Sequence, residues 1–227
     1  SIRGCDVFIL QSHYSPINEH IMEQLIMIDA ARRASAKRIT AVAPFFGYAR
    51  QDKKGLGREP VTARLIADLY TAAGANRILC VDLHTGQIQG FFDIPVDHLS
   101  AHPVVIRWFK SLNLKNTVFV SPDVGNVKRA QAYANQLGGE ICIIDKRRKS
   151  GSEASAVHVI GDVEGKNVLM VDDMITTAGT VTSACKILRE HGVRDIYISA
   201  THAVFAPPAL ERLAACDFTK LAVTDTL

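Results

Sequence analysis

The chain has 227 residues, with 26 Lys or Arg and 23 Asp or Glu, which gives a formal net charge of +3. Its hydrophobic fraction of 48% and charged fraction of 22% are those of a globular protein, and they exclude a disordered, collagen-like or coiled-coil chain. The small net charge does not indicate binding to nucleic acid or to an anionic membrane. No apolar run approaches the ~20 residues that span a bilayer, and no signal peptide is visible. We therefore expect a cytoplasmic protein that binds neither nucleic acid nor a membrane.

Short β-branched runs alternate with helical patterns along the chain. Most of the runs are almost continuously apolar, as in parallel strands that are covered on both faces. The predicted strands are residues 6–11, 38–43, 77–82, 117–120, 140–145, 157–160, 167–172, 195–200 and 220–223. This alternation predicts an α/β fold with largely parallel sheets.

Apolar residues at helical spacing predict helices between these strands. They are marked by Ile21, Leu25 and Ile28, by Val61, Leu65, Ile66 and Leu69, by the segment 124–137, and by Val181, Ala184 and Leu188. Pro60 is expected at the first helical position of the second helix, and Gly74 just past its end.

The two halves of the chain are similar in pattern. RILCVDLHTGQ in the first half and NVLMVDDMITTAG in the second are each a strand followed by one or two acidic residues and a polar loop. We therefore expect two similar domains, residues 1–100 and 101–227, joined near residues 100–103. Because ligands of open α/β sheets bind at the carboxyl ends of the strands, the polar residues that follow the strands are the candidate functional residues.

The strongest candidate is the segment NVLMVDDMITTAGT, residues 167–180. An apolar strand leads into Asp172 and Asp173, and a loop of small and hydroxyl residues then opens a helix. Backbone N–H groups at a helix N-terminus bind phosphate, whereas a carboxylate pair suits sugar hydroxyls or Mg²⁺. Together they describe a ribose 5-phosphate site. The alternative is a strand–turn–helix with ordinary N-caps.

Four other segments carry weaker signals. The run KRRK, which begins at Lys146, can neutralise phosphate charge, although a solvated basic loop is the commoner meaning of such a run. PFFGYARQD, VDLHTGQ and SPDVGNVKRA each follow a strand. Asp123 in the last of them is either a helix cap or a carboxylate directed to a metal. A single His such as His84 is more often structural than catalytic.

Taken together, the five segments resemble one family, the ribose-phosphate pyrophosphokinases or phosphoribosyl pyrophosphate synthetases. FFGYARQD, DLHTGQIQGFFDIPVDHL, SPDVG, IDKRR and VDDMITTAGT occur in the order of that family and at about its spacing. The resemblance implies two domains of the type I phosphoribosyltransferase fold, each a mainly parallel sheet flanked by helices. It also implies transfer of the pyrophosphoryl group of ATP to the 1-hydroxyl of ribose 5-phosphate, with Mg²⁺, in a cytoplasmic homo-oligomer that is expected to be a hexamer.

The resemblance also implies roles for individual residues. Lys146 and Arg148 would be catalytic, and Arg148 would also contact ribose 5-phosphate. The remaining ribose 5-phosphate contacts would be Asp172, Asp173, Thr176, Thr177, Ala178, Gly179 and Thr180. ATP would contact Arg50, Gln51, Asp52 and His84. His84 and Asp123 would bind or orient the metal. We expect His84 near the metal and the phosphates rather than as a direct ligand, because Mg²⁺ prefers oxygen.

The chain departs from the family pattern in places. Asn126 stands where a second Gly is expected after PDxG, and KSGSEASAVHV replaces a Pro-rich continuation of the basic loop. Family members extend further at both ends, so we expect the first domain to be truncated at its start.

Three alternatives remain open at this point. A phosphoribosyltransferase that consumes phosphoribosyl pyrophosphate would share VDDMITTAGT but would not need the other segments. A regulatory paralogue without catalysis would carry a damaged KRR segment, whereas here it is intact. A nucleic-acid-binding module is disfavoured by the small net charge.

Overall fold

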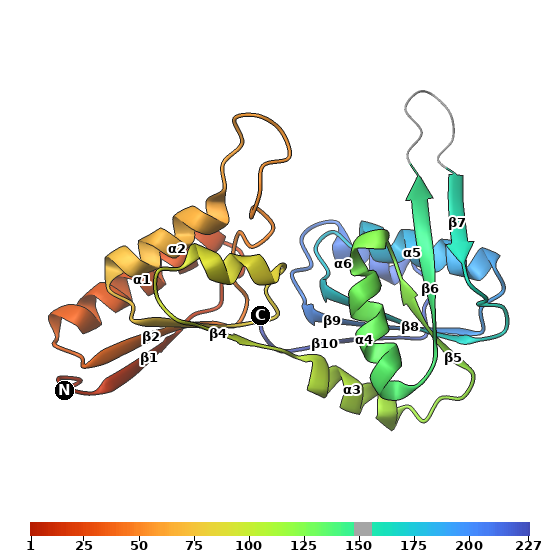
Figure 1. Cartoon of the computed structure of the whole chain (residues 1–227), viewed down its shortest axis with the longest axis horizontal. Coiled ribbons are helices and arrows are strands. Elements are labelled where there is room, and N and C mark those ends of the chain that lie inside the picture. The colour runs from red at the N-terminus through yellow and green to blue at the C-terminus, as the bar shows by residue number, and fades with distance from the viewer. Residues whose placement is uncertain (148–155) are drawn as a thin grey trace. The chain divides into compact units, whose positions relative to one another are not determined.

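The structure is a computed structural model, and it describes residues 1–147 and 156–227. By its internal contacts the chain divides into a first unit, Ser1–Ser100 with Thr226–Leu227, and a second unit, Ala101–Asp225. Each unit is a mainly parallel sheet with helices packed on it, so the predicted α/β architecture is confirmed (Figure 1). No helix within the described part of the chain is long and apolar enough to cross a membrane.

The first unit contains a four-stranded parallel sheet in the order β1-β2-β3-β4. Helices α1 and α2 lie together on one face of this sheet (Figure 1). The elements are β1 (Asp6–Leu10), α1 (Ile17–Arg33), β2 (Arg38–Ala43), α2 (Thr62–Ala73), β3 (Arg77–Val81), the 3₁₀ helix η1 (Gly86–Phe91) and β4 (Val96–Leu99). Strand β4 was not predicted, because its sequence VDHL has only two apolar residues and lacks the continuous apolar run of its neighbours.

Helix α1 forms as predicted, and Ile21, Leu25 and Ile28 are all buried. The expectation for α2 was wrong in two respects. The helix begins at Thr62 with Val61 as N-cap, so Pro60 lies outside it. Its buried residues, Ala63, Ile66, Ala67 and Tyr70, follow the i, i+3, i+4, i+7 spacing of one helical face, whereas Leu65 and Leu69 lie on the exposed face. Gly74 ends the helix in the left-handed conformation, as expected.

The second unit contains a six-stranded sheet in the order β10-β9-β8-β5-β6-β7, parallel except for β7, which runs antiparallel to β6. Its strands are β5 (Thr117–Ser121), β6 (Glu140–Arg147), β7 (Ala156–Ile160), β8 (Asn167–Met174), β9 (Asp195–His202) and β10 (Lys220–Val223). Its helices are α3 (His102–Ser111), the short 3₁₀ helix η2 (Val124–Asn126), α4 (Val127–Leu137), α5 (Gly179–Glu190) and α6 (Ala209–Ala214). Helices α3 and α6 were not predicted.

Two apolar clusters hold this unit together. Side chains of α3 and α4 pack with Phe119 and Leu169 of the sheet in one cluster. Side chains of α5 and α6 pack with Val168 and Ile196 in the other. Because neighbouring strand residues point to opposite faces, the sheet is covered on both sides, which explains the continuous apolar runs of its central strands.

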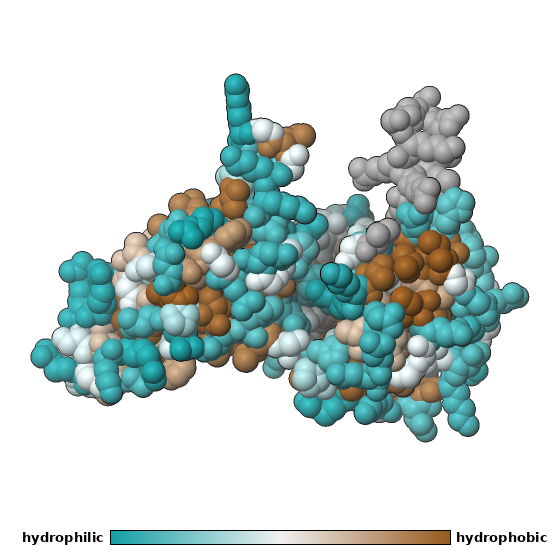
Figure 2. Space-filling view, in the orientation of Figure 1, coloured by the Kyte–Doolittle hydropathy of each residue, from teal (hydrophilic) through white to brown (hydrophobic). Residues whose placement is uncertain are grey.

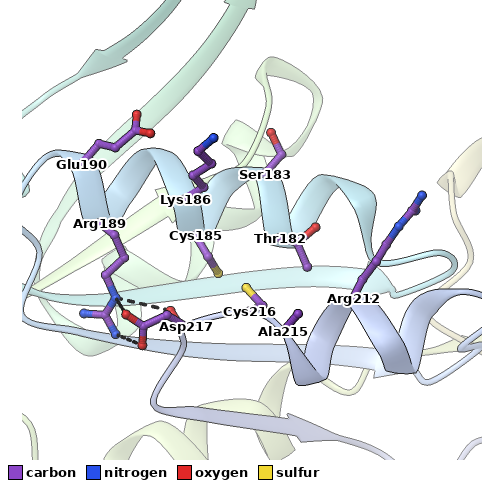
Figure 3. A pocket seen from close by; sticks show the side chains of 10 residues that line it. All are labelled: Thr182, Ser183, Cys185, Lys186, Arg189, Glu190, Arg212, Ala215, Cys216 and Asp217. Carbon is purple, nitrogen blue, oxygen red and sulfur yellow. Dashed lines mark hydrogen bonds and ion pairs between the residues drawn. The ribbon is translucent and has the colours of Figure 1, made fainter.

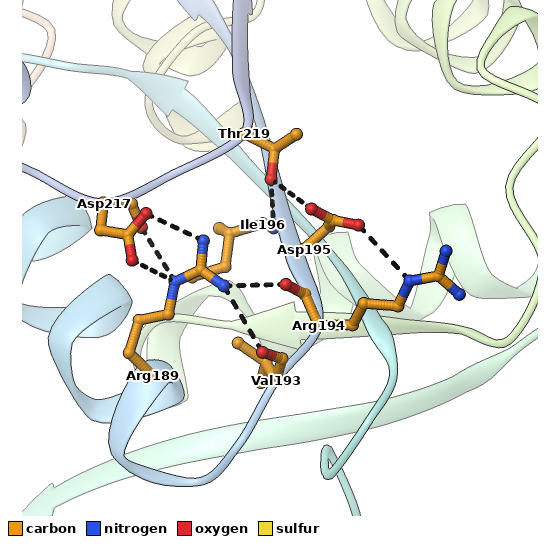
Figure 4. A network of polar contacts seen from close by, with 7 residues as sticks. All are labelled: Arg189, Val193, Arg194, Asp195, Ile196, Asp217 and Thr219. Carbon is orange, nitrogen blue, oxygen red and sulfur yellow. Dashed lines mark hydrogen bonds and ion pairs between the residues drawn. The ribbon is translucent and has the colours of Figure 1, made fainter.

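Polar contacts fix the end of α5. The Arg189 guanidinium donates hydrogen bonds to the Val193 and Arg194 carbonyl oxygens and forms an ion pair with Asp217 (Figure 4). Thr219 Oγ1 donates to Asp195 Oδ1 at 3.0 Å in the same network. The network joins the C-terminus of α5 to the start of β9 and to the segment that follows α6.

Candidate functional site

The acidic pair lies within strand β8 rather than after it. The strand was predicted to end at Asp172 but continues to Met174, where Met174 pairs with His202 of β9. Asp173 is buried, with 4% of its surface exposed, and Asp172 is partly buried. Both carboxylates are therefore held on the rigid sheet, which orients them more firmly than a loop would.

Each carboxylate of the pair has a partner at the start of α4. Asn126 Nδ2 donates to Asp172 Oδ1 at 3.1 Å, and Arg129 Nη1 lies 3.7 Å from Asp173 Oδ1. Burial raises the pKa of Asp172, and the neighbouring Asp173 raises it further, whereas Arg129 lowers it. Sequence reasoning assigned no function to Asn126 or Arg129, although both belong to the segment SPDVGNVKRA that it selected.

The loop after β8 leads directly into α5. Ile175 and Val181 are buried on either side of it and anchor it in the core. Ala178, the N-cap of α5, has φ 61° in the left-handed region and makes no side-chain cap hydrogen bond. The alanine side chain cannot cap the first turn, and the positive end of the helix dipole lies beside Thr176, Thr177 and Thr180. Such a helix start suits an anion.

Arg212 of α6 supports this loop. Its Nη1 donates to the Thr177 carbonyl oxygen at 3.0 Å, and it also lines a cavity of about 710 Å³ beside α5 and α6 (Figure 3). The cavity is lined on the α5 side by Thr182, Cys185 and Lys186, among others. No pattern in the sequence pointed to Arg212, because it comes from a short helix that was not predicted.

Asp123 caps the turn that precedes α4. Its Oδ1 accepts a hydrogen bond from the Asn126 N–H at 3.0 Å, and the Ser121 hydroxyl donates to its carbonyl oxygen at 2.6 Å. Of the two alternatives for this residue, the structure contains the cap. The role of Asp123 toward a metal stays a prediction. Among residues 1–147 and 156–227 no group of three or more His, Cys, Asp or Glu side chains is arranged to hold a metal ion.

In the first unit, two loops meet at the carboxyl ends of β2 and β3. Thr85 Oγ1 donates to Asp52 Oδ2 at 2.8 Å, which joins the segment ARQD to the segment HTGQ. Two hydrogen bonds hold Gln51 in place. Its backbone carbonyl oxygen accepts from the Ala63 N–H, and its side-chain Oε1 accepts from the Thr62 hydroxyl. Arg50 is exposed and His84 is partly buried. The structure thus brings Asp52 to the loop that carries His84.

A buried polar network supports the loop that follows β2. His13 Nδ1 accepts from the Gly47 N–H at 3.0 Å, and His13 Nε2 lies 2.9 Å from Gln24 Oε1 and 2.7 Å from the Tyr70 hydroxyl. Gln24 Nε2 in turn donates to the carbonyl oxygens of Ile9 and Val42. Burial lowers the pKa of His13 to about 4, so the imidazole is neutral at physiological pH. This network was not found from the sequence, since its members are scattered over four helices and strands and two loops.

The basic segment begins inside strand β6. Lys146 and Arg147 pair in backbone register with Val157 and Ala156 of β7. The predicted strand ended at Asp145, two residues too early. Arg148, the other predicted catalytic residue, lies outside the residues that the structure describes.

The second unit defines the class of the protein. A parallel strand with paired carboxylates, followed by a Thr-rich loop that opens a helix, is the arrangement of a phosphoribosyltransferase-type domain. Consistent with this class, residues 98–216 match the family model of the phosphoribosyl transferase domain. Residues 1–74 match the model of the N-terminal domain of ribose phosphate pyrophosphokinase.

Proteins that are similar over the whole length of this chain identify its family more narrowly than the two domain models do. The chain is 54% identical over 228 residues to a ribose-phosphate pyrophosphokinase of Nostoc, covering 100% of this chain and 69% of the relative. It is 55% identical to that of Synechococcus elongatus, with the same coverage. A crystal structure of phosphoribosylpyrophosphate synthetase from Mycobacterium smegmatis matches with a TM-score of 0.94 and 52% identity, over all of this chain and 74% of that one. The chain belongs to the ribose-phosphate pyrophosphokinase family.

Proposed function

We propose that this protein is a ribose-phosphate diphosphokinase that makes phosphoribosyl pyrophosphate for nucleotide biosynthesis. The 1-hydroxyl oxygen of ribose 5-phosphate attacks the β-phosphorus of ATP. The bond between that phosphorus and the bridging oxygen of the α-phosphate breaks, and AMP leaves. The observation that carries this proposal is the match of residues 1–74 to the N-terminal domain of ribose phosphate pyrophosphokinase, because a phosphoribosyltransferase alone would account only for residues 98–216.

Ribose 5-phosphate would bind in the second unit. The start of α5 and the hydroxyls of Thr176, Thr177 and Thr180 offer donors to the 5-phosphate, together with the backbone of Ala178 and Gly179. Asp172 and Asp173 offer acceptors to the ribose hydroxyls. Their place on strand β8, next to Asn126 and Arg129, supports this assignment, since a carboxylate that accepts a sugar hydroxyl must be held in a fixed orientation.

ATP would contact the loops of the first unit. Arg50, Gln51 and Asp52 stand at the carboxyl end of β2, and His84 stands at the carboxyl end of β3. The hydrogen bond between Thr85 and Asp52 supports a joint role for these two loops. Lys146 and Arg148, from the basic segment, would neutralise the charge that develops on the β-phosphate and on departing AMP.

Mg²⁺ would arrive with the nucleotide. The described residues contain no cluster of three potential metal ligands. One oxygen of the Asp123 carboxylate accepts a hydrogen bond from the Asn126 N–H. This donor set fits an ion that is bound mainly by phosphate oxygens and water and takes one or two protein ligands, as Mg²⁺ commonly does. Bound there, the ion would neutralise phosphate charge, and Asp123 and His84 would orient it.

We also propose a homo-oligomer, with a hexamer as the expected size. Apolar side chains are exposed on the edge strand β1, where Phe8 and Leu10 keep 64% and 66% of their surface exposed, and on α1, where Met22 and Ile26 keep 55% and 61%. Figure 2 shows apolar residues gathered over parts of an otherwise mostly hydrophilic face. Exposed apolar patches of this kind are typical of surfaces that pack against another chain.

The test is an assay of the purified protein with ATP, Mg²⁺ and ribose 5-phosphate, with separation of the nucleotides. The proposal requires AMP formed in equal amount to phosphoribosyl pyrophosphate, and no AMP when ribose 5-phosphate is omitted. Release of ADP instead would show transfer of a single phosphoryl group and would overturn the proposal. Binding of ribose 5-phosphate without any turnover would favour a regulatory paralogue.

A further inference from the structure

Asn126 makes an unusual use of its side chain. It is the N-cap residue of α4, and Asn at this position normally accepts a hydrogen bond from an N–H of the first turn. Here its side chain makes no cap hydrogen bond. Instead Nδ2 donates across to strand β8, to Asp172 Oδ1, at 3.1 Å. The side chain thus forms its hydrogen bond with the acidic pair and not with the first turn of its own helix.

The backbone of Asn126 holds this side chain in place. Its N–H donates to Asp123 Oδ1 at 3.0 Å, and its φ of −93° and ψ of 2° are allowed for any residue other than proline. The turn is therefore fixed by the backbone and by Asp123. Removing the side chain of Asn126 should leave the turn intact, which makes the amide separable from the fold.

The two carboxylates of the pair have different partners on the segment 126–129. Asp173 faces the cation Arg129 at 3.7 Å, whereas Asp172 receives a neutral amide donor. Burial and the neighbouring Asp173 raise the pKa of Asp172, so its ionised form needs stabilisation. Asp172 Oδ1 also accepts the Asp173 N–H at 2.8 Å, so two neutral donors converge on this oxygen, stabilise the ionised form without an ion pair and fix the direction of the carboxylate.

We propose that Asn126 is a positioning residue for ribose 5-phosphate, acting by holding the Asp172 carboxylate in the orientation that accepts a ribose hydroxyl. This inference rests on the proposed function of Asp172 in sugar binding. It assigns to Asn126 no contact with the reacting atoms. Loss of the amide should therefore weaken binding of the sugar phosphate more than it slows turnover at saturation.

The experiment compares Asn126→Ala and Asn126→Asp with a control on the same helix. The control is Gln131→Ala, which removes a similar amide hydrogen bond, from Gln131 Nε2 to Asn135 Oδ1, away from the acidic pair. For each protein we would measure KM for ribose 5-phosphate, KM for ATP, kcat, thermal stability and the calorimetric Kd for ribose 5-phosphate. Asn126→Ser is a second small variant for use if the alanine protein does not fold.

Asn126→Ala should raise KM and Kd for ribose 5-phosphate about 10-fold, the effect of losing one hydrogen bond to a charged group. KM for ATP should stay unchanged and kcat should change less than about threefold. Asn126→Asp should be worse than Asn126→Ala, because it places an acceptor against an acceptor. Gln131→Ala should match the wild type. In an Asp172→Ala background, Asn126→Ala should have no further effect.

Three results would overturn the inference. In the first, Asn126→Ala binds ribose 5-phosphate like the wild type. In the second, it weakens ATP and ribose 5-phosphate equally together with thermal stability, which indicates a structural role only. In the third, its effect persists in full when Asp172 is absent. A wild-type protein that neither binds nor converts ribose 5-phosphate would instead refute the proposed function itself, and the inference with it.

Discussion

Protonation of one buried imidazole should govern how the stability of the first unit depends on pH. His13 is fully buried, and its Nδ1 accepts from the Gly47 N–H. A proton on Nδ1 would set two N–H groups against each other and would place a charge in the core beneath the loop that carries Arg50 and Asp52. Burial lowers the pKa of His13 to about 4, whereas the unfolded chain titrates near 6.5.

The sign follows from proton binding. Between pH 6.5 and pH 4 the unfolded chain binds a proton at this position that the folded chain does not, so acid favours unfolding. The contribution of His13 to stability is complete above pH 6.5 and is lost as the pH falls toward 4. From these two pKa values, the loss is about 2 kcal/mol at pH 5 and about 3 kcal/mol at pH 4.

The assay is urea unfolding of the wild type and His13→Gln at pH 7.5 and pH 5. Glutamine does not titrate, so the difference in pH dependence between the two proteins isolates His13 from the other acids and bases. We expect the wild type to lose about 2 kcal/mol more than His13→Gln over this interval, although the variant will be less stable at pH 7.5. Trp108, the single tryptophan of the chain, lies in α3 of the second unit and gives an internal reference by fluorescence. Equal pH dependence in the two proteins would refute the reasoning.

Three further predictions concern the second unit. Lys146→Ala should lower kcat roughly 10²–10³-fold and leave the Kd for ribose 5-phosphate almost unchanged; wild-type turnover in a steady-state assay would remove Lys146 from the mechanism. Asp172→Ala should weaken ribose 5-phosphate binding by calorimetry roughly 10- to 100-fold, since a charged acceptor is lost, and unaltered affinity would contradict its role. Arg212→Met should raise KM for ribose 5-phosphate roughly fivefold, because the Thr177 carbonyl loses its donor and the loop loosens. The same KM in Arg212→Met and the wild type would show that the loop holds its shape without this contact.

The fold class follows from the sequence because burial on both faces of a parallel sheet makes its strands continuously apolar. Nine of the ten strands within residues 1–147 and 156–227 were located from their apolar runs, and β4 was missed because it lacks such a run. Helix faces were harder to predict. In α2, alanines occupy two of the four buried positions, Ala63 and Ala67, while Leu65 and Leu69 lie on the exposed face, so a choice by hydrophobicity selected two exposed residues.

The site was only partly predictable for a similar reason. Motif residues such as Asp172 and Thr176 follow strands in the sequence and could be found by position. Their supporting residues, Asn126, Arg129 and Arg212, come from other elements, so only the tertiary structure brings them to the site. The buried contacts of His13 were likewise not predictable from the sequence, since no local pattern relates His13 to Gln24 and Tyr70.

The fate of each phosphate of ATP tests the central claim most directly. The protein would be incubated with ribose 5-phosphate, Mg²⁺ and ATP labelled in separate reactions at the α- or the γ-phosphate. The proposed pyrophosphoryl transfer predicts that the α label appears in AMP, and that the γ label appears in a sugar that carries a diphosphate at carbon 1. Recovery of the γ label as a single phosphoryl group on the sugar, or as inorganic phosphate with ADP, would contradict it.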